Sequence, residues 1–308
     1  MRGNFDDTQT GVKRIFSDPG MQEWLQQHNA RFSSANSINW GRLAPQIAYY
    51  FSAYADLLRS GALRTGDKVN FVVPTGNFGN ILAGWFAREM GLPIHRLVCA
   101  ANRNHVLTDF IRTGTYDRNR LFHRTLSPSM DILISSNLER LLYLLAERDT
   151  GRTAAWMKAL QTQGSYQVDN TIRDQIAGTF WSDSSDDAET VARIRTVFSS
   201  YGYLVDTHTA VAMDILEKYR EQTKDPTPAV VVSTASPFKF AEAVADAILT
   251  KEQSGDCTET ELPEILSRET GLEVPAGLRD LESRPILHDQ QASIDEMWDR
   301  VLDFLKRN

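Results

Sequence analysis

Two glycines beside two asparagines stand where a phosphate group could bind. The segment Gly76-Asn77-Phe78-Gly79-Asn80 directly follows the apolar run V-N-F-V-V-P and precedes an apolar helical pattern. Backbone N–H groups at a helix start favour an anion, and glycines let the backbone approach it without a Cβ atom. The segment is neither a Walker motif nor a G-x-G-x-x-G dinucleotide motif. A tight turn without a ligand would explain the same residues, so both interpretations stay open.

A second polar group lies at the start of another expected helix. Asn36, Ser37 and Arg42 belong to the segment N-S-I-N-W-G-R. An amide, a hydroxyl and a guanidinium that converge at a helix start can bind a phosphate. Asparagine and serine are also common helix N-caps, so a structural role is the alternative.

Two more polar turns could contribute. Thr234, in S-T-A-S-P, follows an apolar run, and its hydroxyl could hydrogen-bond a ring nitrogen of a ligand or cap the next helix. The segment that contains Asp206 and His208 reads D-T-H-T-A and is more typical of a helix cap, because a histidine without a nearby serine or cysteine partner is weak evidence of catalysis.

These segments need a scaffold that brings strand ends together. The strand V-N-F-V-V-P, the glycine-containing turn, the helix I-L-A-G-W-F-A-R-E-M and the strand I-H-R-L-V-C-A-A follow one another, which is typical of a parallel βαβ unit. A-V-V-V-S-T-A-S-P-F-K-F repeats the strand and turn before another helix. We predict an α/β fold with a mainly parallel twisted sheet flanked by helices, in which ligands lie at the carboxyl ends of the strands.

Composition narrows the class of protein. The chain has 308 residues and a formal net charge of -7, which argues against broad nucleic-acid binding. No apolar run is long enough to span a membrane, and no signal peptide is visible. Cys99 and Cys257 lack the spacing of a metal site. We therefore expect a cytoplasmic protein without a metal, with Cys99 as a small buried apolar residue.

The order of five longer strings carries more information than any one of them. The strings are G-N-F-D-D-T-Q, N-S-I-N-W-x-R-L-x-x-Q-I-x-Y-Y-F, V-P-T-G-N-F-G-N-I-L-A-G, T-L-S-P-S-M-D-I-L-I-S-S-N-L-E-R-L-L and D-T-H-T-A-V-A. From about residue 3 to residue 250 the chain resembles threonine synthases, most closely their longer bacterial and fungal branch. Residues 251–308 match that family only loosely.

The resemblance implies a fold-type-II lyase that uses pyridoxal 5'-phosphate. Such an enzyme converts O-phosphohomoserine and water to threonine and phosphate, the last step of threonine biosynthesis. By resemblance, the cofactor phosphate would bind to backbone N–H groups of Gly76, Asn77, Phe78, Gly79 and Asn80.

The remaining roles also come from the resemblance. Thr234 would hydrogen-bond the pyridine nitrogen of the cofactor, and Asn36, Ser37 and Arg42 match residues that hold the phosphate of the substrate. Asp206 and His208 match the family without a definite role.

One part of the family's machinery is missing from this sequence. The family carries its Schiff-base lysine in an F-K-D segment upstream of G-N-F-D-D, and neither that segment nor the serine/glycine/aspartate-rich turn after it occurs here. We expect Lys13 and Lys239 on helix surfaces and assign no catalytic residue. The chain is expected to be a C-terminal portion of a threonine synthase. It is also expected to be poorly active, because loss of the lysine that anchors the cofactor greatly lowers the catalytic rate. The alternative is a non-catalytic homologue that binds phosphorylated amino acids as a sensor or subunit.

We expect three regions along the chain. Residues 1–32 would end a smaller α/β domain, residues 33–255 would form the large cofactor-binding domain with a helical insertion at about 130–200, and residues 256–308 would form a C-terminal helical segment. The sequence leaves open whether the large domain is complete, whether Met1 is the native start, and which oligomer forms.

Overall fold

The computed structural model describes residues 2–3, 5–250, 253, 257–287 and 290–307. The chain divides into a terminal unit, made of residues 1–35 and 282–308, and a sheet unit, made of residues 36–281. The boundary that we expected between residues 255 and 256 lies outside the described residues.

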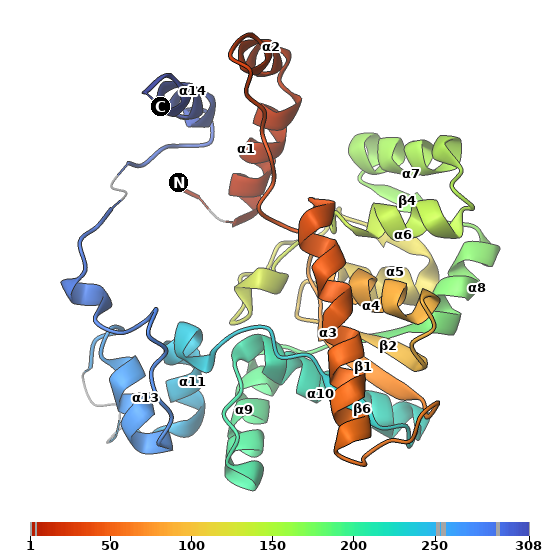
Figure 1. Ribbon diagram of the computed structural model, residues 1–308, viewed down its shortest axis with the longest axis vertical. Coiled ribbons are helices and arrows are strands. Elements are labelled where there is room, and N and C mark those ends of the chain that lie inside the picture. Colours follow the sequence, from red (N-terminus) through yellow and green to blue (C-terminus); the bar gives the residue numbers. More distant parts are fainter. Residues whose placement is uncertain (1, 4, 251–252, 254–256, 288–289, 308) are drawn as a thin grey trace. The chain divides into compact units, whose positions relative to one another are not determined.

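The sheet unit is built on four parallel strands in the order β5-β2-β1-β6 (Figure 1). Their bounds are β1 (Val69–Pro74), β2 (Ile94–Ala101), β5 (Phe180–Ser184) and β6 (Ala229–Val231). All six residues of β1 are buried, because helices cover both faces of a parallel sheet, and this explains why all of them except Asn70 are apolar. A separate antiparallel pair joins β3 (Thr115–Asp117) to β4 (Ser165–Gln167).

Helices cover the main sheet on its two faces. Phe71 and Val73 pack on one face with residues of the helices from α3 to α8, whereas Val72 packs on the other face with Val211 and Ile215 of α10. The helices of this unit are α3 (Trp40–Arg59), α4 (Gly79–Glu89), α5 (Val106–Thr113), α6 (Leu138–Leu145), α7 (Thr150–Gln163), α8 (Asn170–Thr179), α9 (Asp187–Tyr201), α10 (Thr207–Thr223), α11 (Ala241–Ile248) and α13 (Leu262–Thr270). The predicted fold class, an α/β fold with a mainly parallel sheet flanked by helices, is confirmed.

Two short 3-10 helices, η1 (Pro128–Met130) and η2 (Pro237–Phe240), also belong to this unit. A third, η3 (Leu281–Ser283), begins at its last residue and continues into the sequence of the terminal unit. The stretch 130–200, expected to be helical, contains α6, α7, α8 and most of α9, and it also contains β4 and β5. Thus part of this stretch belongs to the main sheet, which the polar sequence of β5, F-W-S-D-S, does not reveal.

The terminal unit contains α1 (Phe5–Ser17), α2 (Pro19–Gln27) and α14 (Met297–Arg307). Ile15, Met21 and Leu25 are buried there. The apolar side chains of α14 and of the residues at its start pack against them, namely Met297, Trp298, Val301, Leu302 and Leu305. Among the described helices, none is both long and apolar enough to cross a membrane.

A partly buried carboxylate, that of Asp225, links the amino ends of two strands. Asp225 Oδ2 accepts hydrogen bonds from Asn70 Nδ2 of β1 at 2.8 Å and from the Tyr219 hydroxyl of α10 at 2.5 Å. Its Oδ1 accepts from the Thr227 backbone N–H at 2.9 Å, just before β6. Burial alone would raise the pKa of Asp225, but hydrogen bonds from Thr227, Tyr219 and Asn70 outweigh it and hold the pKa well below its usual range.

The substitution Asp225→Asn should therefore lower the free energy of unfolding at pH 7 by about 1–2 kcal/mol, because the charged acceptor is lost. A carboxylate whose folded pKa is depressed stabilises fully above its unfolded pKa of about 3.9 and loses that contribution as pH falls toward the folded value. The difference between wild type and variant should thus shrink below about pH 4.

Urea unfolding at pH 7 and pH 3 measures this difference. The matched control is Asp56→Asn, which removes an exposed carboxylate paired with Arg59 on α3 and should leave stability nearly unchanged. Equal stability of Asp225→Asn and Asp56→Asn at pH 7 would contradict the interpretation.

Candidate functional site

The carboxyl ends of β1 and β6 bring two predicted segments to one edge of the sheet. These strands are parallel neighbours, with Val72 opposite Val231, and the Val232 N–H donates to the Val72 carbonyl at 2.9 Å. The 76–80 loop follows β1, and the 233–236 turn that holds Thr234 follows β6. Thr234 is exposed. The register of the strands alone thus places the predicted ring contact beside the predicted phosphate loop.

The first turn of α4 is open to an anion. Phe78 precedes the helix with φ 61°, a left-handed conformation, and no side chain caps the helix start. This conformation is uncommon for an aromatic residue, but Phe78 is buried and its ring lies 5.6 Å from that of Phe180. Packing of the ring thus holds the loop in a shape that leaves the N–H groups after it without side-chain acceptors.

Ser37 meets this helix start directly. A Cβ atom on Gly79 would lie 2.3 Å from Ser37 Oγ and 2.6 Å from Ser37 Cβ, so no side chain fits there. Asn137 Nδ2 donates to Ser37 Oγ at 2.9 Å and to the Asn77 carbonyl at 2.8 Å. The structure therefore brings one predicted substrate residue onto the predicted cofactor loop, although the two segments are separated by α3 and β1.

The other two predicted substrate residues are less constrained. Asn36 is exposed, and its Oδ1 accepts from the Ile38 N–H at 3.0 Å in a local turn. Arg42 is exposed in the first turn of α3, and no hydrogen bond or ion pair to another described residue engages its guanidinium. The Arg42 side chain is thus free to bind an anion.

Sequence reasoning missed the residues that support the loop. Ser135 Oγ donates to the Gly76 carbonyl at 3.0 Å, and Arg140 Nη1 donates to the Ser37 carbonyl at 2.7 Å. With Asn137, these residues come from S-S-N-L-E-R, a part of the strings that resemble the family. The resemblance of this string to the family could have indicated that its residues support the site. Its residue types by themselves indicated only the start of a helix.

Asn80 also has a fixed partner. The hydroxyl of Tyr50 lies 2.7 Å from Asn80 Oδ1 and 2.9 Å from the Asn80 carbonyl. Tyr50 is buried at 2% exposure, and burial raises its pKa far above the usual range. Tyr50 therefore stays a neutral hydroxyl that anchors the end of the 76–80 loop to α3.

Asp206 and His208 lie in the interior behind the same edge. Asp206 is the N-cap of α10, and its carboxylate accepts from the backbone N–H groups of His208 and Thr209. Its Oδ1 lies 3.0 Å from His208 Nδ1. Burial raises the pKa of Asp206, but hydrogen bonds from His208 and Thr209 outweigh it and leave the pKa below its usual range. The predicted cap is present, together with a second contact that the sequence did not indicate.

The remaining candidates are placed outside this group. Lys13 in α1 and Lys239 in η2 are exposed, as expected. Cys99 is buried, as expected, and burial raises the pKa of its thiol to about 11. In the described part of the chain, no group of three or more histidine, cysteine, aspartate or glutamate side chains could hold a metal ion.

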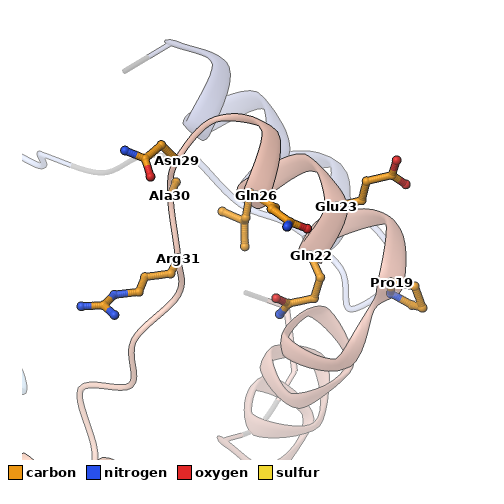
Figure 2. Close-up of a pocket in the computed structure, with 8 residues that line it drawn as sticks. Pro19, Gln22, Glu23, Gln26, Asn29, Ala30 and Arg31 are labelled. Carbon is orange, nitrogen blue, oxygen red and sulfur yellow. The ribbon is translucent and has the colours of Figure 1, made fainter.

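A pocket of about 790 Å³ lies in the terminal unit (Figure 2). Its lining comes from α2 and the segment after it, and consists of Pro19, Gln22, Glu23, Leu25, Gln26, Asn29, Ala30 and Arg31. None of the residues that the sequence singled out lines it, so it does not belong to the predicted site.

Comparison with known proteins gives this arrangement a context. Residues 209–286 match the family model described as "Threonine synthase, C-terminal". The human protein named threonine synthase-like 1 is 43% identical over 254 residues, which is 82% of this chain and 34% of that protein. The threonine synthase of Saccharomyces cerevisiae is 39% identical over 260 residues, which is 80% of this chain and 49% of that protein.

The fold has a solved counterpart as well. The crystal structure of threonine synthase from Brucella melitensis with bound pyridoxal phosphate is similar with a TM-score of 0.77 and 35% identity, over 99% of this chain and 58% of that one. The chain thus spans between about a third and somewhat more than half of the proteins it matches.

The close contact at Gly79 gives a first test of the site. The substitution Gly79→Ala should lower the free energy of unfolding by about 1–3 kcal/mol, because the new methyl group overlaps Ser37. The control is Gly178→Ala in α8, where no atom lies within 4 Å of an added Cβ, and which should be neutral or stabilising by up to about 1 kcal/mol.

Urea unfolding measures the free energies of unfolding of Gly79→Ala and Gly178→Ala. The double substitution Gly79→Ala with Ser37→Gly removes the overlapping side chain and should recover part of the lost stability. A Gly79→Ala variant as stable as Gly178→Ala would show that α4 and the Ser37 turn do not meet as described.

Proposed function

The chain belongs to the threonine synthase family, and we propose that the protein to which it corresponds converts O-phosphohomoserine and water to threonine and phosphate. The observation that carries the proposal is the contact of Ser37 with the uncapped start of α4. This contact joins the segment proposed for the substrate to the loop proposed for pyridoxal phosphate. The similarity to threonine synthases over most of the chain supports the same reading.

The residues present fit a cofactor phosphate. At Gly76 an added Cβ would lie 2.6 Å from the Ser129 carbonyl, and at Gly79 it would meet Ser37. Both positions keep the backbone bare beside the first turn of α4, where N–H groups can donate to phosphate oxygens. We propose that backbone N–H groups of the 76–80 loop hold the phosphate of pyridoxal phosphate.

The ring of the cofactor would extend toward the next strand. Thr234 follows β6, the neighbour of β1, and carries an exposed hydroxyl. We propose that this hydroxyl hydrogen-bonds the pyridine nitrogen. When bound, pyridoxal phosphate supplies an electron sink for the bonds that change at the substrate's Cα and Cβ atoms.

The substrate's phosphate has its own candidates. Ser37 supplies a hydroxyl beside the start of α4, and Asn36 supplies an amide next to it in the chain. Arg42, in the first turn of α3, supplies a guanidinium that no other described residue engages. A guanidinium binds phosphate oxygens through charge-assisted hydrogen bonds. These residues bind and orient, and none of them moves a proton in the proposal.

The proposal also includes the enzyme class, the fold type and the cellular location. The protein would be a lyase, its large domain would be of fold type II, and its location would be the cytoplasm. The support for that location is cysteine usage, since Cys99 and Cys257 are both free.

A second candidate is a protein that binds phosphorylated amino acids without turning them over. The observation that favours it is the composition of the candidate site: the described residues assigned to it carry amides, hydroxyls and guanidinium groups, and no lysine is among them. Similarity to human threonine synthase-like 1 is compatible with either candidate.

The decisive experiment incubates the purified chain with pyridoxal phosphate and O-phosphohomoserine. Threonine and inorganic phosphate are measured together, and borohydride reduction with peptide mapping identifies any lysine that holds the cofactor covalently. Equal amounts of both products support the enzyme. Binding of O-phosphohomoserine without phosphate release is expected both of the second candidate and of a poorly active portion of the enzyme. In that case a cofactor trapped on one lysine favours the enzyme, and absence of binding contradicts both candidates.

Arg42 offers a sharper prediction. The substitution Arg42→Gln should weaken binding of O-phosphohomoserine by about tenfold or more, because a charge-assisted hydrogen bond to phosphate is lost. Binding of pyridoxal phosphate should stay unchanged, since Arg42 is assigned to the substrate alone. Isothermal titration with each ligand separates the two effects.

The matched control is Arg59→Gln at the other end of α3. Arg59 is exposed and pairs with Asp56, so its loss should leave both affinities as they are. If Arg42→Gln and Arg59→Gln bind O-phosphohomoserine equally well, Arg42 does not hold the substrate.

A further inference from the structure

The start of α10 is more deeply buried and more fully bonded than a helix cap needs. Asp206, His208 and Thr209 are 1%, 2% and 3% exposed. The His208 and Thr209 N–H groups already satisfy the cap through Asp206 Oδ1. Asp206 also accepts from His208 Nδ1 and from the Thr209 hydroxyl. These side-chain bonds therefore require an explanation beyond capping.

The bond to Ser129 fixes the tautomer of His208. The Ser129 backbone N–H lies 3.2 Å from His208 Nε2 and can only donate. Nε2 must therefore be the unprotonated nitrogen, and the proton on Nδ1 is donated to Asp206. The ring also lies 4.8 Å from that of Phe240. Both ring nitrogens are thus engaged, which leaves neither available for a substrate.

On one side, this chain of bonds reaches the 76–80 loop. Ser129 belongs to η1, and its carbonyl lies 2.6 Å from the position of a Cβ on Gly76. The same segment is held from the other direction by Asp131, whose carboxylate accepts from Asn102 Nδ2 at 2.8 Å and Asn104 Nδ2 at 2.9 Å. His208 therefore holds Ser129, the residue of η1 whose carbonyl lies next to Gly76.

On the other side, the chain of bonds reaches the 233–236 turn. The Thr209 hydroxyl donates to Asp206 Oδ2, and it lies 3.2 Å from Ser233 Oγ. The Thr209 hydroxyl thereby links the Asp206 carboxylate to the Ser233 side chain. Ser233 immediately precedes Thr234, the residue proposed to bind the cofactor ring.

We propose that Asp206 and His208 are positioning residues that hold the 76–80 loop and the 233–236 turn at a fixed separation. The two segments follow different strands. Side chains at the start of α10 reach the 233–236 turn through Thr209 and reach the 76–80 loop indirectly, through Ser129 of η1. That these segments hold the phosphate and ring of one ligand rests on the proposed function. The role of His208 in holding η1 in place does not depend on the proposed function.

Two amide substitutions at one position separate this role from general stability. In His208→Gln the carboxamide oxygen reaches the place of Nε2 and can still accept from Ser129. In His208→Asn the shorter carboxamide reaches only the place of Nδ1, so the bond to Asp206 is kept and the bond to Ser129 is lost. The control is His105→Asn, a partly exposed histidine at the start of α5.

Amide hydrogen exchange of the ligand-free chain is the first readout. In His208→Asn the amides of Ser129, Met130, Asp131 and Thr75 should exchange about tenfold faster, whereas His208→Gln should stay within about threefold of wild type. The affinity for pyridoxal phosphate, measured by titration, should fall by about tenfold in His208→Asn and be kept in His208→Gln.

The outcomes are distinguishable. Unchanged exchange in His208→Asn, or equal damage in both variants, overturns the positioning role. If wild type does not bind pyridoxal phosphate, the proposed function fails while the exchange data still decide this inference. If His208→Asn does not fold, Thr209→Val provides the test, because it removes the hydroxyl that links Asp206 to Ser233 and leaves the bond from Ser129 to His208 in place. Its affinity should then fall about tenfold while exchange at Ser129 stays unchanged, and unchanged affinity in a wild type that binds would overturn the role.

Discussion

The site depends on two places where backbone and side chains approach so closely that a Cβ atom has no room. At Gly79 the neighbour is the Ser37 side chain, and at Gly76 it is the Ser129 carbonyl. The first contact brings the turn before α3 onto the start of α4, and the second brings η1 under the loop after β1. Without both contacts, the start of α4 would resemble the other helix starts of the fold, with no additional polar groups gathered around it. With both contacts, the Ser37 hydroxyl and the Asn137 amide lie beside the backbone N–H groups of the first turn of α4.

These contacts are held by buried polar groups with satisfied hydrogen bonds. Asp131 is 5% exposed and accepts from the side chains of Asn102, Asn104 and Thr125. Asp206 is satisfied in a similar way. A buried carboxylate costs stability unless donors surround it, so such a network tolerates few alternative arrangements. The carboxyl edge of the sheet is therefore rigid because of polar bonds as much as of the apolar core.

The sequence predicted the parts of this site that are local. The apolar runs of β1 and β2 and the turn between β1 and α4 could be read directly, because burial on both faces of a sheet leaves a continuous apolar pattern. The strand β5 was missed because the last three of its five residues, in F-W-S-D-S, are polar. The contacts made by Asn137 and His208 were missed for a different reason. Each joins residues far apart in the chain, and a polar residue near a helix start looks the same whether or not it supports a loop.

The charges of the chain show why such local geometry decides which ligand fits. The formal net charge is -7, so a large polyanion is repelled over the whole surface. Charges in water are screened beyond about 8–10 Å at physiological salt, which confines the repulsion felt by a small phosphate to its near neighbours. At the start of α4 those neighbours are N–H groups, the Ser37 hydroxyl and amides, with no carboxylate among the residues that assemble there. The proposed binding of a small phosphate ester at this edge is therefore compatible with an acidic protein, because hydrogen-bond donors that are oriented before the ligand arrives lower the cost of binding.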